Sequence, residues 1–186
     1  MNIQKAKIEN TEVLLVDSVP QSAFPPPDWG YWKQMVPETM SGNEVLLLGI
    51  GAGTIARLLK DKFPKVKITG VDNNSTLIMS ATNEFGLNEI GMEIVIEDGY
   101  EYVKKTKKRF DLIIVDMWNG YWFPIKSLSK EFIEDLKNIL NDKGEVRINT
   151  PNLDYSAKEI TEGLEAYRDD IGRNVIYRFN LTKEKK

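Results

Sequence analysis

Residues 45–72 read VLLLGIGAGTIARLLKDKFPKVKITGVD, and the rest of the chain is best understood outward from this stretch. Its first four residues are apolar, as in a strand buried on both faces, and they lead directly into a glycine-rich loop at 49–53. Apolar residues at helical spacing follow from Ile55 to Phe63, and a second apolar strand closes on Asp72. This order predicts a βαβ unit.

The glycine loop and Asp72 together indicate a nucleoside site. Glycines let the backbone turn sharply and approach a ligand, and an acid that closes the second strand can accept hydrogen bonds from a ribose diol. Thr54 stands where the dinucleotide fingerprint has its third Gly or Ala, so a tight turn in another α/β protein is the alternative. We expect Gly49, Gly51 and Gly53 to bind a nucleoside cofactor.

The composition limits the chemistry. The chain has 186 residues, which fit one domain over 1–186, and it contains neither Cys nor His. Thiol nucleophiles, imidazole bases and thiolate or imidazole metal sites are thereby excluded, and we expect no metal. Carboxylates, tyrosine hydroxyls and lysines remain for any proton transfer.

The charge balance argues against nucleic-acid binding. The 25 Lys and Arg face 28 Asp and Glu, whereas phosphate binding needs a concentrated basic face. One basic cluster, residues 104–109, lies where a helix should end, and cations there complement the helix dipole. No apolar run approaches a membrane span, and the N-terminus lacks a signal-peptide core. We expect a cytoplasmic protein with no nucleic-acid or membrane partner.

Residues 1–30 are predicted to form a short strand pair, at 3–8 and 12–17, followed by a proline-rich aromatic segment. A short helix should follow over 32–40. Trp29, Tyr31 and Trp32 either cover a sheet edge or form one wall of a substrate pocket, because such side chains are large and amphipathic.

Two further predicted strands matter for the site, and both lead into acids. A capped helix over 75–85 leads to a strand over 92–96, which runs into Asp98 and Gly99, and a buried strand over 110–116 ends in Asp116. The carboxyl ends of parallel strands meet at one edge, so Asp72, Asp98 and Asp116 should converge there. The alternative for each acid is to cap the next turn or helix.

The remaining elements alternate in type. Residues 129–140 are predicted to form an amphipathic helix and residues 145–150 a strand. A capping-box pattern at Ser156 opens a predicted helix that continues through Tyr167 and ends at Gly172. Residues 174–181 alternate in polarity and should form the closing strand.

The motifs VLLLGIGAGT, ITGVD, EDGYEYV and FDLIIVD, together with VLLVDSVPQ and LSKEFIEDLKNIL, resemble class I S-adenosylmethionine-dependent methyltransferases. Within that superfamily the chain is most similar to the spermidine synthase (polyamine aminopropyltransferase) family. The resemblance implies a Rossmann-like, doubly wound α/β fold. Its sheet should be seven-stranded and mostly parallel, with the short strand pair at the N-terminus. A homodimer is also suggested by the family.

The resemblance also implies roles for the acids. Asp72 would hold the ribose hydroxyls, Asp98 would lie by the adenine amino group, and Asp116 would face the reacting amine as the catalytic residue. The expected cofactor is S-adenosylmethionine or its decarboxylated form. The expected cofactor-binding residues are Gln21, Gly49, Gly51, Gly53, Asp72, Asn73, Asp98 and Gly99.

An aromatic loop, WNGYWFP, follows Asp116 and could box a cation or a planar substrate. Packing of this loop on Trp29 and Trp32 is the alternative. The expected substrate-pocket residues are Tyr31, Trp32, Trp118, Asn119, Tyr121 and Trp122.

Three positions depart from the spermidine synthase pattern. Lys33 replaces an acid of the Tyr-His-Glu signature, Asn119 replaces the second acid of the Asp-x-x-Asp turn, and Ala52 replaces the Asp of the glycine loop. A diamine needs paired carboxylates, whereas Ala52 removes a charge that would repel the carboxylate of S-adenosylmethionine. We therefore expect transfer of a methyl group to a small-molecule amine or hydroxyl. Aminopropyl transfer to an altered acceptor, and a catalytically silent nucleoside-binding or oligomerisation module, are the alternatives.

Overall fold

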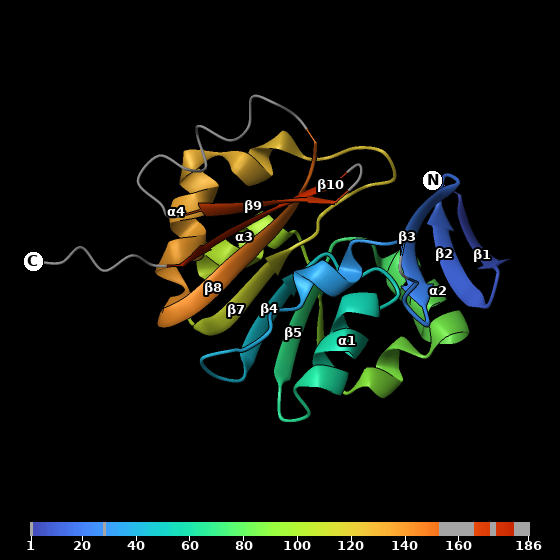
Figure 1. The fold of residues 1–186 in the computed structure, drawn as a ribbon, viewed down its shortest axis with the longest axis horizontal. Helices are drawn as coiled ribbons and strands as arrows, with labels where there is room; N and C mark the ends of the chain where they lie inside the picture. The colour runs from blue at the N-terminus through green and yellow to red at the C-terminus, as the bar shows by residue number, and fades with distance from the viewer. Residues whose placement is uncertain (1, 28, 153–165, 172–173, 181–186) are drawn as a thin grey trace, which may run out of the picture.

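The computed structural model describes residues 2–27, 29–152, 166–171 and 174–180, and a seven-stranded sheet forms its central layer (Figure 1). The strand order is β6-β5-β4-β7-β8-β10-β9. The bounds are β4 Glu44–Leu48, β5 Lys67–Asp72, β6 Glu93–Ile96, β7 Phe110–Val115, β8 Leu140–Pro151, β9 Ala166–Ile171 and β10 Asn174–Asn180. Pairing is parallel from β6 to β8, and β10 runs antiparallel to both β8 and β9. The predicted seven-stranded, mostly parallel sheet is confirmed.

Helices cover both faces of this sheet because its central strands are apolar on both sides. The helices are α1 Thr54–Lys62, α2 Ser75–Phe85, α3 Gly99–Lys105 and α4 Lys130–Asn138, with single turns of 3-10 helix at η1 Trp32–Met35, η2 Leu87–Ile90 and η3 Ile125–Leu128. Leu46 and Leu48 of β4 pack with α3 and α4, whereas Val45 and Leu47 pack with α1 and η1. This alternation follows from the two-residue period of a strand.

A separate three-stranded antiparallel sheet stands beside the central one and comprises β1 Ile3–Ile8, β2 Thr11–Val16 and β3 Val19–Phe24 (Figure 1). The predicted strand pair is correct for β1 and β2 but incomplete, since β3 adds a third strand. Pro20 hides this strand in the sequence, although proline is tolerated in an edge strand.

Two predicted helices need correction. Residues 166–171 form strand β9, not the end of a helix, and the rest of that predicted helix, at 156–165, lies outside the described residues. Pairing of β9 with β10 along its whole length outweighs the local helical spacing. The helix predicted over 32–40 is one turn of 3-10 helix, because Pro37 forces Val36 into an extended conformation.

The basic cluster at 104–109 lies at the end of α3, as expected. Lys104, Lys105 and Lys108 pair with Glu131, Glu97 and Glu93. No helix in the described part of the chain combines the length and the apolarity that crossing a bilayer requires.

Candidate active site

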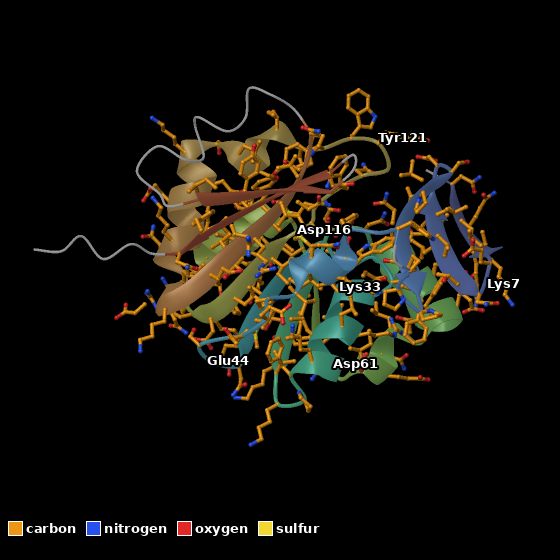
Figure 2. All side chains as sticks on the ribbon, viewed as in Figure 1. Lys7, Lys33, Glu44, Asp61, Asp116 and Tyr121 are labelled. Carbon is orange, nitrogen blue, oxygen red and sulfur yellow. The ribbon has the colours of Figure 1, made fainter. Side chains whose placement is uncertain are left out.

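A cleft of about 480 Å³ opens at the carboxyl edge of the parallel strands, where ligands sit in open α/β sheets. It is bounded by the glycine loop, the ends of β5 and β7, the start of α3, strand β3 and the loop after β7. Every predicted site residue except Gly53 and Tyr121 lines it. Figure 2 shows Asp116 near the centre of the molecule and Tyr121 at its rim.

The glycine loop passes directly against the end of β7. Gly49 has a φ of +87°, and a Cβ there would lie 2.2 Å from the backbone oxygen of Asp116. Only glycine allows both the left-handed backbone and this approach. The Asp116 amide also donates to the Leu48 oxygen at 2.7 Å, so the loop and the predicted catalytic acid are held together.

Strand β3 ties the glycine loop to the N-terminal sheet. The Ala52 amide donates to Ser22 Oγ at 2.7 Å. Thr54 Oγ1 donates to the Ala23 oxygen at 3.0 Å and accepts from the Ala23 amide at 2.9 Å. The threonine that departs from the dinucleotide fingerprint therefore anchors β3. Ser22 was not predicted, and its sequence signal is weak because a lone serine in a polar segment has no distinctive pattern.

Asp72 is held in place by backbone groups from two sides. One carboxylate oxygen accepts from the Ile50 amide at 3.0 Å, and the other accepts from the Asn74 amide at 2.9 Å. Asn74 in turn caps α2 by accepting from the Leu77 amide. These bonds fix the carboxylate between the glycine loop and α2, on the wall of the cleft that Asn73 also lines.

Asp98 caps helix α3, which is the role predicted from the sequence as the alternative to ligand binding. Its Oδ1 accepts from the amides of Tyr100 and Glu101 at 2.9 and 3.1 Å, which caps α3. Asp98 and Gly99 nevertheless line the cleft. Capping through one oxygen leaves the geometry open to a ligand contact through the other.

Asp116 is the most strongly perturbed acid of the cleft. Its carboxylate accepts from the Tyr31 hydroxyl at 2.9 and 3.1 Å and from Asn149 Nδ2 at 2.8 Å. Burial raises the pKa of Asp116 to about 6, against the lowering effect of the bonds from Asn149 and Tyr31. Burial and the nearby Asp116 charge also raise the pKa of the Tyr31 hydroxyl well above its ordinary value. A carboxyl that titrates near neutrality is suited to proton transfer.

Asn149, on β8, is a site residue that the sequence reasoning missed. It is fully buried, and its side-chain oxygen accepts from Asn174 Nδ2 at 2.9 Å. Its backbone oxygen accepts from Trp118 Nε1 at 3.3 Å. Strand β8 lies parallel to β7, so polar residues near the carboxyl end of β8 are expected at the same sheet edge as Asp116. The polar residues at the end of the predicted strand over 145–150 could therefore have indicated Asn149.

Arg147 holds the turn that carries Tyr31. The guanidinium is buried, and its Nη1 donates to the Gln34 oxygen at 2.6 Å while its Nε bonds Glu145. The backbone amide of Gln34 donates to the backbone oxygen of Tyr31 at 3.0 Å. Strand β8 thus supports Asp116 twice, directly through Asn149 and indirectly through Arg147 and η1.

The aromatic residues near the cleft differ in how far they are buried and in whether they line it. Trp118 is half-buried, lines the cleft and lies with its ring centroid 5.4 Å from that of Phe123. Trp122 also lines the cleft but is 80% exposed, and Tyr121 is 71% exposed and lies outside the lining. Trp32 is buried and packs 5.2 Å from the Tyr31 ring. Tyr121 is the one predicted substrate-pocket residue that the fold does not bring to the cleft.

The charges of the cleft have one sign. Asp72, Asp98 and Asp116 line it, and no lysine or arginine does so among the described residues. Ala52 lies elsewhere, since its methyl group is buried in an apolar cluster with Leu14 and Ile50. Position 52 therefore does not support the predicted choice of the ordinary methyl donor.

The chain has relatives of known name and fold. A family model described as methyltransferase small domain matches residues 33–169. The polyamine aminopropyltransferase of Chromobacterium violaceum is 35% identical over 104 residues, covering 55% of this chain and 40% of the relative. The chain thus spans less than half the length of this curated relative.

Solved structures share the fold. A probable spermidine synthase from Corynebacterium glutamicum superposes with a TM-score of 0.80 at 18% identity, covering 97% of this chain and 77% of the other. A spermidine synthase in complex with the transition-state analogue AdoDATO has a TM-score of 0.72 at 19% identity, with coverages of 96% and 73%. The resemblance predicted from the motifs is confirmed, and the chain belongs to the methyltransferase small domain family, with the class I S-adenosylmethionine-dependent methyltransferase fold.

Proposed function

We propose that this protein transfers an aminopropyl group from decarboxylated S-adenosylmethionine to an amine. The observation that carries the proposal is the charge of the cleft. Three carboxylates line it, and among the described residues no lysine or arginine does so. The decarboxylated donor carries a sulfonium and an ammonium but no carboxylate, so its charge complements this lining. The ordinary donor would add a carboxylate without a cation to meet it.

The donor end of the cleft suits a nucleoside. Gly49 and Gly51 line it without side chains, and both oxygens of Asp72 are already oriented by backbone amides. A carboxylate held in this way can accept hydrogen bonds from a ribose diol with little further loss of side-chain freedom. Asp98, at the start of α3, is our candidate for the adenine amino group.

The reaction needs little acid–base catalysis, which fits a chain without histidine. When bound, a sulfonium donor supplies an electrophilic carbon: the amine nitrogen bonds to it as the carbon–sulfur bond breaks, and that electron pair stays on sulfur. Asp116 orients the amine by accepting its N–H and takes up the proton released from nitrogen. Tyr31 and Asn149 hold the carboxylate for this task.

Calorimetric titration with four ligands tests the proposal. Decarboxylated S-adenosylmethionine should bind at least about ten-fold more tightly than S-adenosylmethionine, a difference of about 1.4 kcal/mol. 5′-Methylthioadenosine, the product of aminopropyl transfer, should also bind, and NAD should not. Equal or tighter binding of S-adenosylmethionine would contradict the choice of donor.

Methyl transfer is the second candidate, and the methyltransferase small domain match favours it. It would use the same residues, with S-adenosylmethionine as the donor. If either donor binds but a screen of amines and hydroxylated compounds gives no turnover, a silent binding module fits better than both.

A further inference from the structure

The side of the cleft around Asp116 is poor in charge and rich in aromatic surface. The loop that follows β7, residues 116–124, contains no acid other than Asp116. Trp118, Trp122 and Phe123 of this loop line the cleft, together with Asn119. In the part of the chain that the structure describes, this side therefore offers one negative charge within a largely aromatic wall.

The other two acids of the cleft lie at or just after the ends of β5 and β6, which are separated from β7 by β4, and both already have hydrogen-bond partners. Asp72 bonds the glycine loop and the turn before α2, and Asp98 caps α3. In the proposed function both bind the nucleoside of the donor, Asp72 at the ribose and Asp98 at the adenine amino group. Among the described residues, Asp116 is then the one cleft carboxylate left for the acceptor.

Resting on the proposed function, we propose that the acceptor is a primary amine with one ammonium group and an apolar or aromatic arm. Asp116, which lines the cleft, binds the ammonium form of the acceptor and takes up one of its protons, and this leaves a neutral amine as the nucleophile. The arm lies against Trp118, Phe123 and Trp122.

The charge count favours one ammonium over two. A second ammonium brought to this side of the cleft would lose its water, and in the described part of the chain no carboxylate other than Asp116 lines this side to replace that water. Aromatic faces attract cations, but a cation–π contact offsets only part of that desolvation cost. An apolar arm loses nothing on leaving water and gains contact area with the same rings.

The exposure of Trp122 fits this assignment. Its ring is 80% exposed while it lines the mouth of the cleft, so a bound apolar arm would remove much of its surface from water. Tyr121, the preceding residue, is 71% exposed but does not line the cleft. The two neighbours form a matched pair for mutation.

The test uses binding and does not depend on turnover. Protein saturated with 5′-methylthioadenosine is titrated calorimetrically with n-pentylamine, 3-phenylpropylamine and 1,5-diaminopentane. The two monoamines should bind at least about ten-fold more tightly than the diamine. Failure of 5′-methylthioadenosine itself to bind would overturn the proposed function and this inference together.

Three variants sharpen the result. Trp122→Ala should weaken the monoamines by about five-fold or more, and Tyr121→Ala should change their affinity by less than about two-fold. Asn119→Asp supplies a second carboxylate and should strengthen the diamine by about ten-fold. Preference of the parent protein for the diamine, or equal effects of Trp122→Ala and Tyr121→Ala, would overturn the inference, as would the absence of amine binding to the complex.

Discussion

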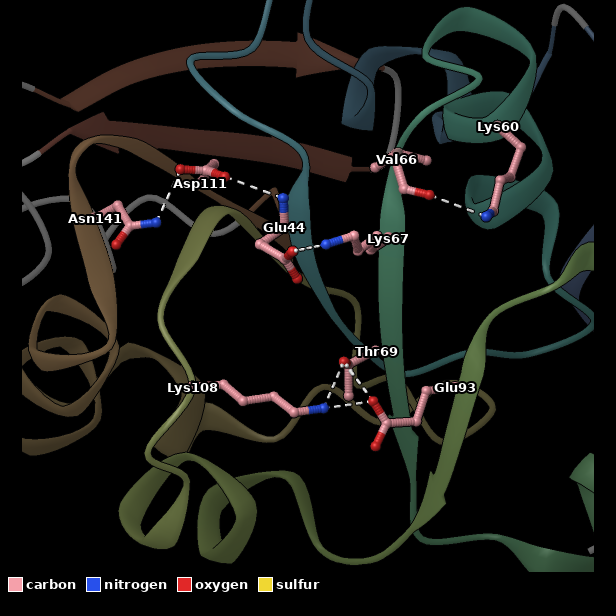
Figure 3. A network of polar contacts seen from close by, with 9 residues as sticks. All are labelled: Glu44, Lys60, Val66, Lys67, Thr69, Glu93, Lys108, Asp111 and Asn141. Carbon is pink, nitrogen blue, oxygen red and sulfur yellow. Dashed lines mark hydrogen bonds and ion pairs between the residues drawn. The ribbon is translucent and has the colours of Figure 1, made fainter.

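The ion-paired acids at the amino ends of the central strands contrast with the acids that line the cleft at the carboxyl ends. At the amino ends of the strands, Glu44 pairs with Lys67 at 2.8 Å and Glu93 pairs with Lys108 (Figure 3). The bond with Lys108 lowers the pKa of Glu93, and the same bond raises the pKa of Lys108. These charges neutralise each other at the surface.

At the carboxyl ends the three acids that line the cleft have neutral partners, whereas Glu97, which does not line it, pairs with Lys105. Asp72 and Asp98 accept from backbone amides, and Asp116 accepts from a hydroxyl and a side-chain amide. Burial raises the pKa of Asp116, whereas the pKa of Glu93 is lowered by its lysine partner. An acid held by neutral donors keeps its charge for a ligand, whereas an acid paired with lysine does not.

Asp116→Asn should have the largest effect and would test this contrast most directly. The amide preserves size but cannot accept the proton, so turnover should fall ~100-fold or more while donor affinity changes little. Turnover, calorimetric donor affinity and melting temperature are to be measured on the same variant.

Asp111→Asn is the matched control, because Asp111 lies near the amino end of the same strand. Its carboxylate accepts from the Glu44 amide and Asn141 Nδ2, away from the cleft (Figure 3). Turnover should persist in this variant. If Asp116→Asn also keeps most of its turnover and only melts earlier, Asp116 serves the fold and not the chemistry.

Asp72→Ala should weaken binding of either sulfonium donor by about ten-fold or more. Loss of a charge-assisted hydrogen bond to a ligand costs ~1.5 to 3 kcal/mol. Glu93→Ala changes an acid at the other end of a neighbouring strand and should leave donor affinity unchanged. Unchanged affinity for both donors in Asp72→Ala would refute the ribose assignment.

The pH dependence should reveal the raised pKa of Asp116. The ionised form accepts the proton, so turnover should rise with pH through about 6 and level off above it. Removing a donor that favours the charged form raises the pKa, so Tyr31→Phe should move the rising limb upward by about one pH unit. A profile that is flat between pH 5 and 7 would speak against this role.

The raised pKa of Asp116 should also affect stability, which is expected to fall with rising pH where turnover is expected to rise. The native state holds the Asp116 proton more tightly than the unfolded chain does, so ionisation disfavours folding. The contribution of this group to the free energy of unfolding should therefore fall as pH rises from about 4 through 6. Asp116→Asn should remove this component from melting curves recorded across that range.

Lys108→Ala should have the smallest effect. The pair with Glu93 is largely exposed, and exposed ion pairs contribute at most ~1 kcal/mol to stability. Donor affinity and turnover should stay within about two-fold of the parent. A large loss of either would break the contrast between the two ends of the sheet.

Much of the architecture follows from local sequence. The apolar run before Gly49 predicts a buried strand wherever it lies, and the glycines after it permit a sharp turn. Acids at the ends of successive parallel strands must share an edge, which brought Asp72, Asp98 and Asp116 to one cleft. These inferences hold because strand burial, turn chemistry and parallel order depend on neighbouring residues and on simple topology.

The surroundings of Asp116 depend on the tertiary structure. Its partners Tyr31 and Asn149 are 85 and 33 residues away in sequence, and no local pattern connects them to it. The strand at 166–171 likewise takes its form from β10, against its own helical spacing. The sequence by itself determined which acids reach the edge of the sheet. Only packing decided which neutral donors surround them, because such hydrogen bonds form between segments that folding alone brings together.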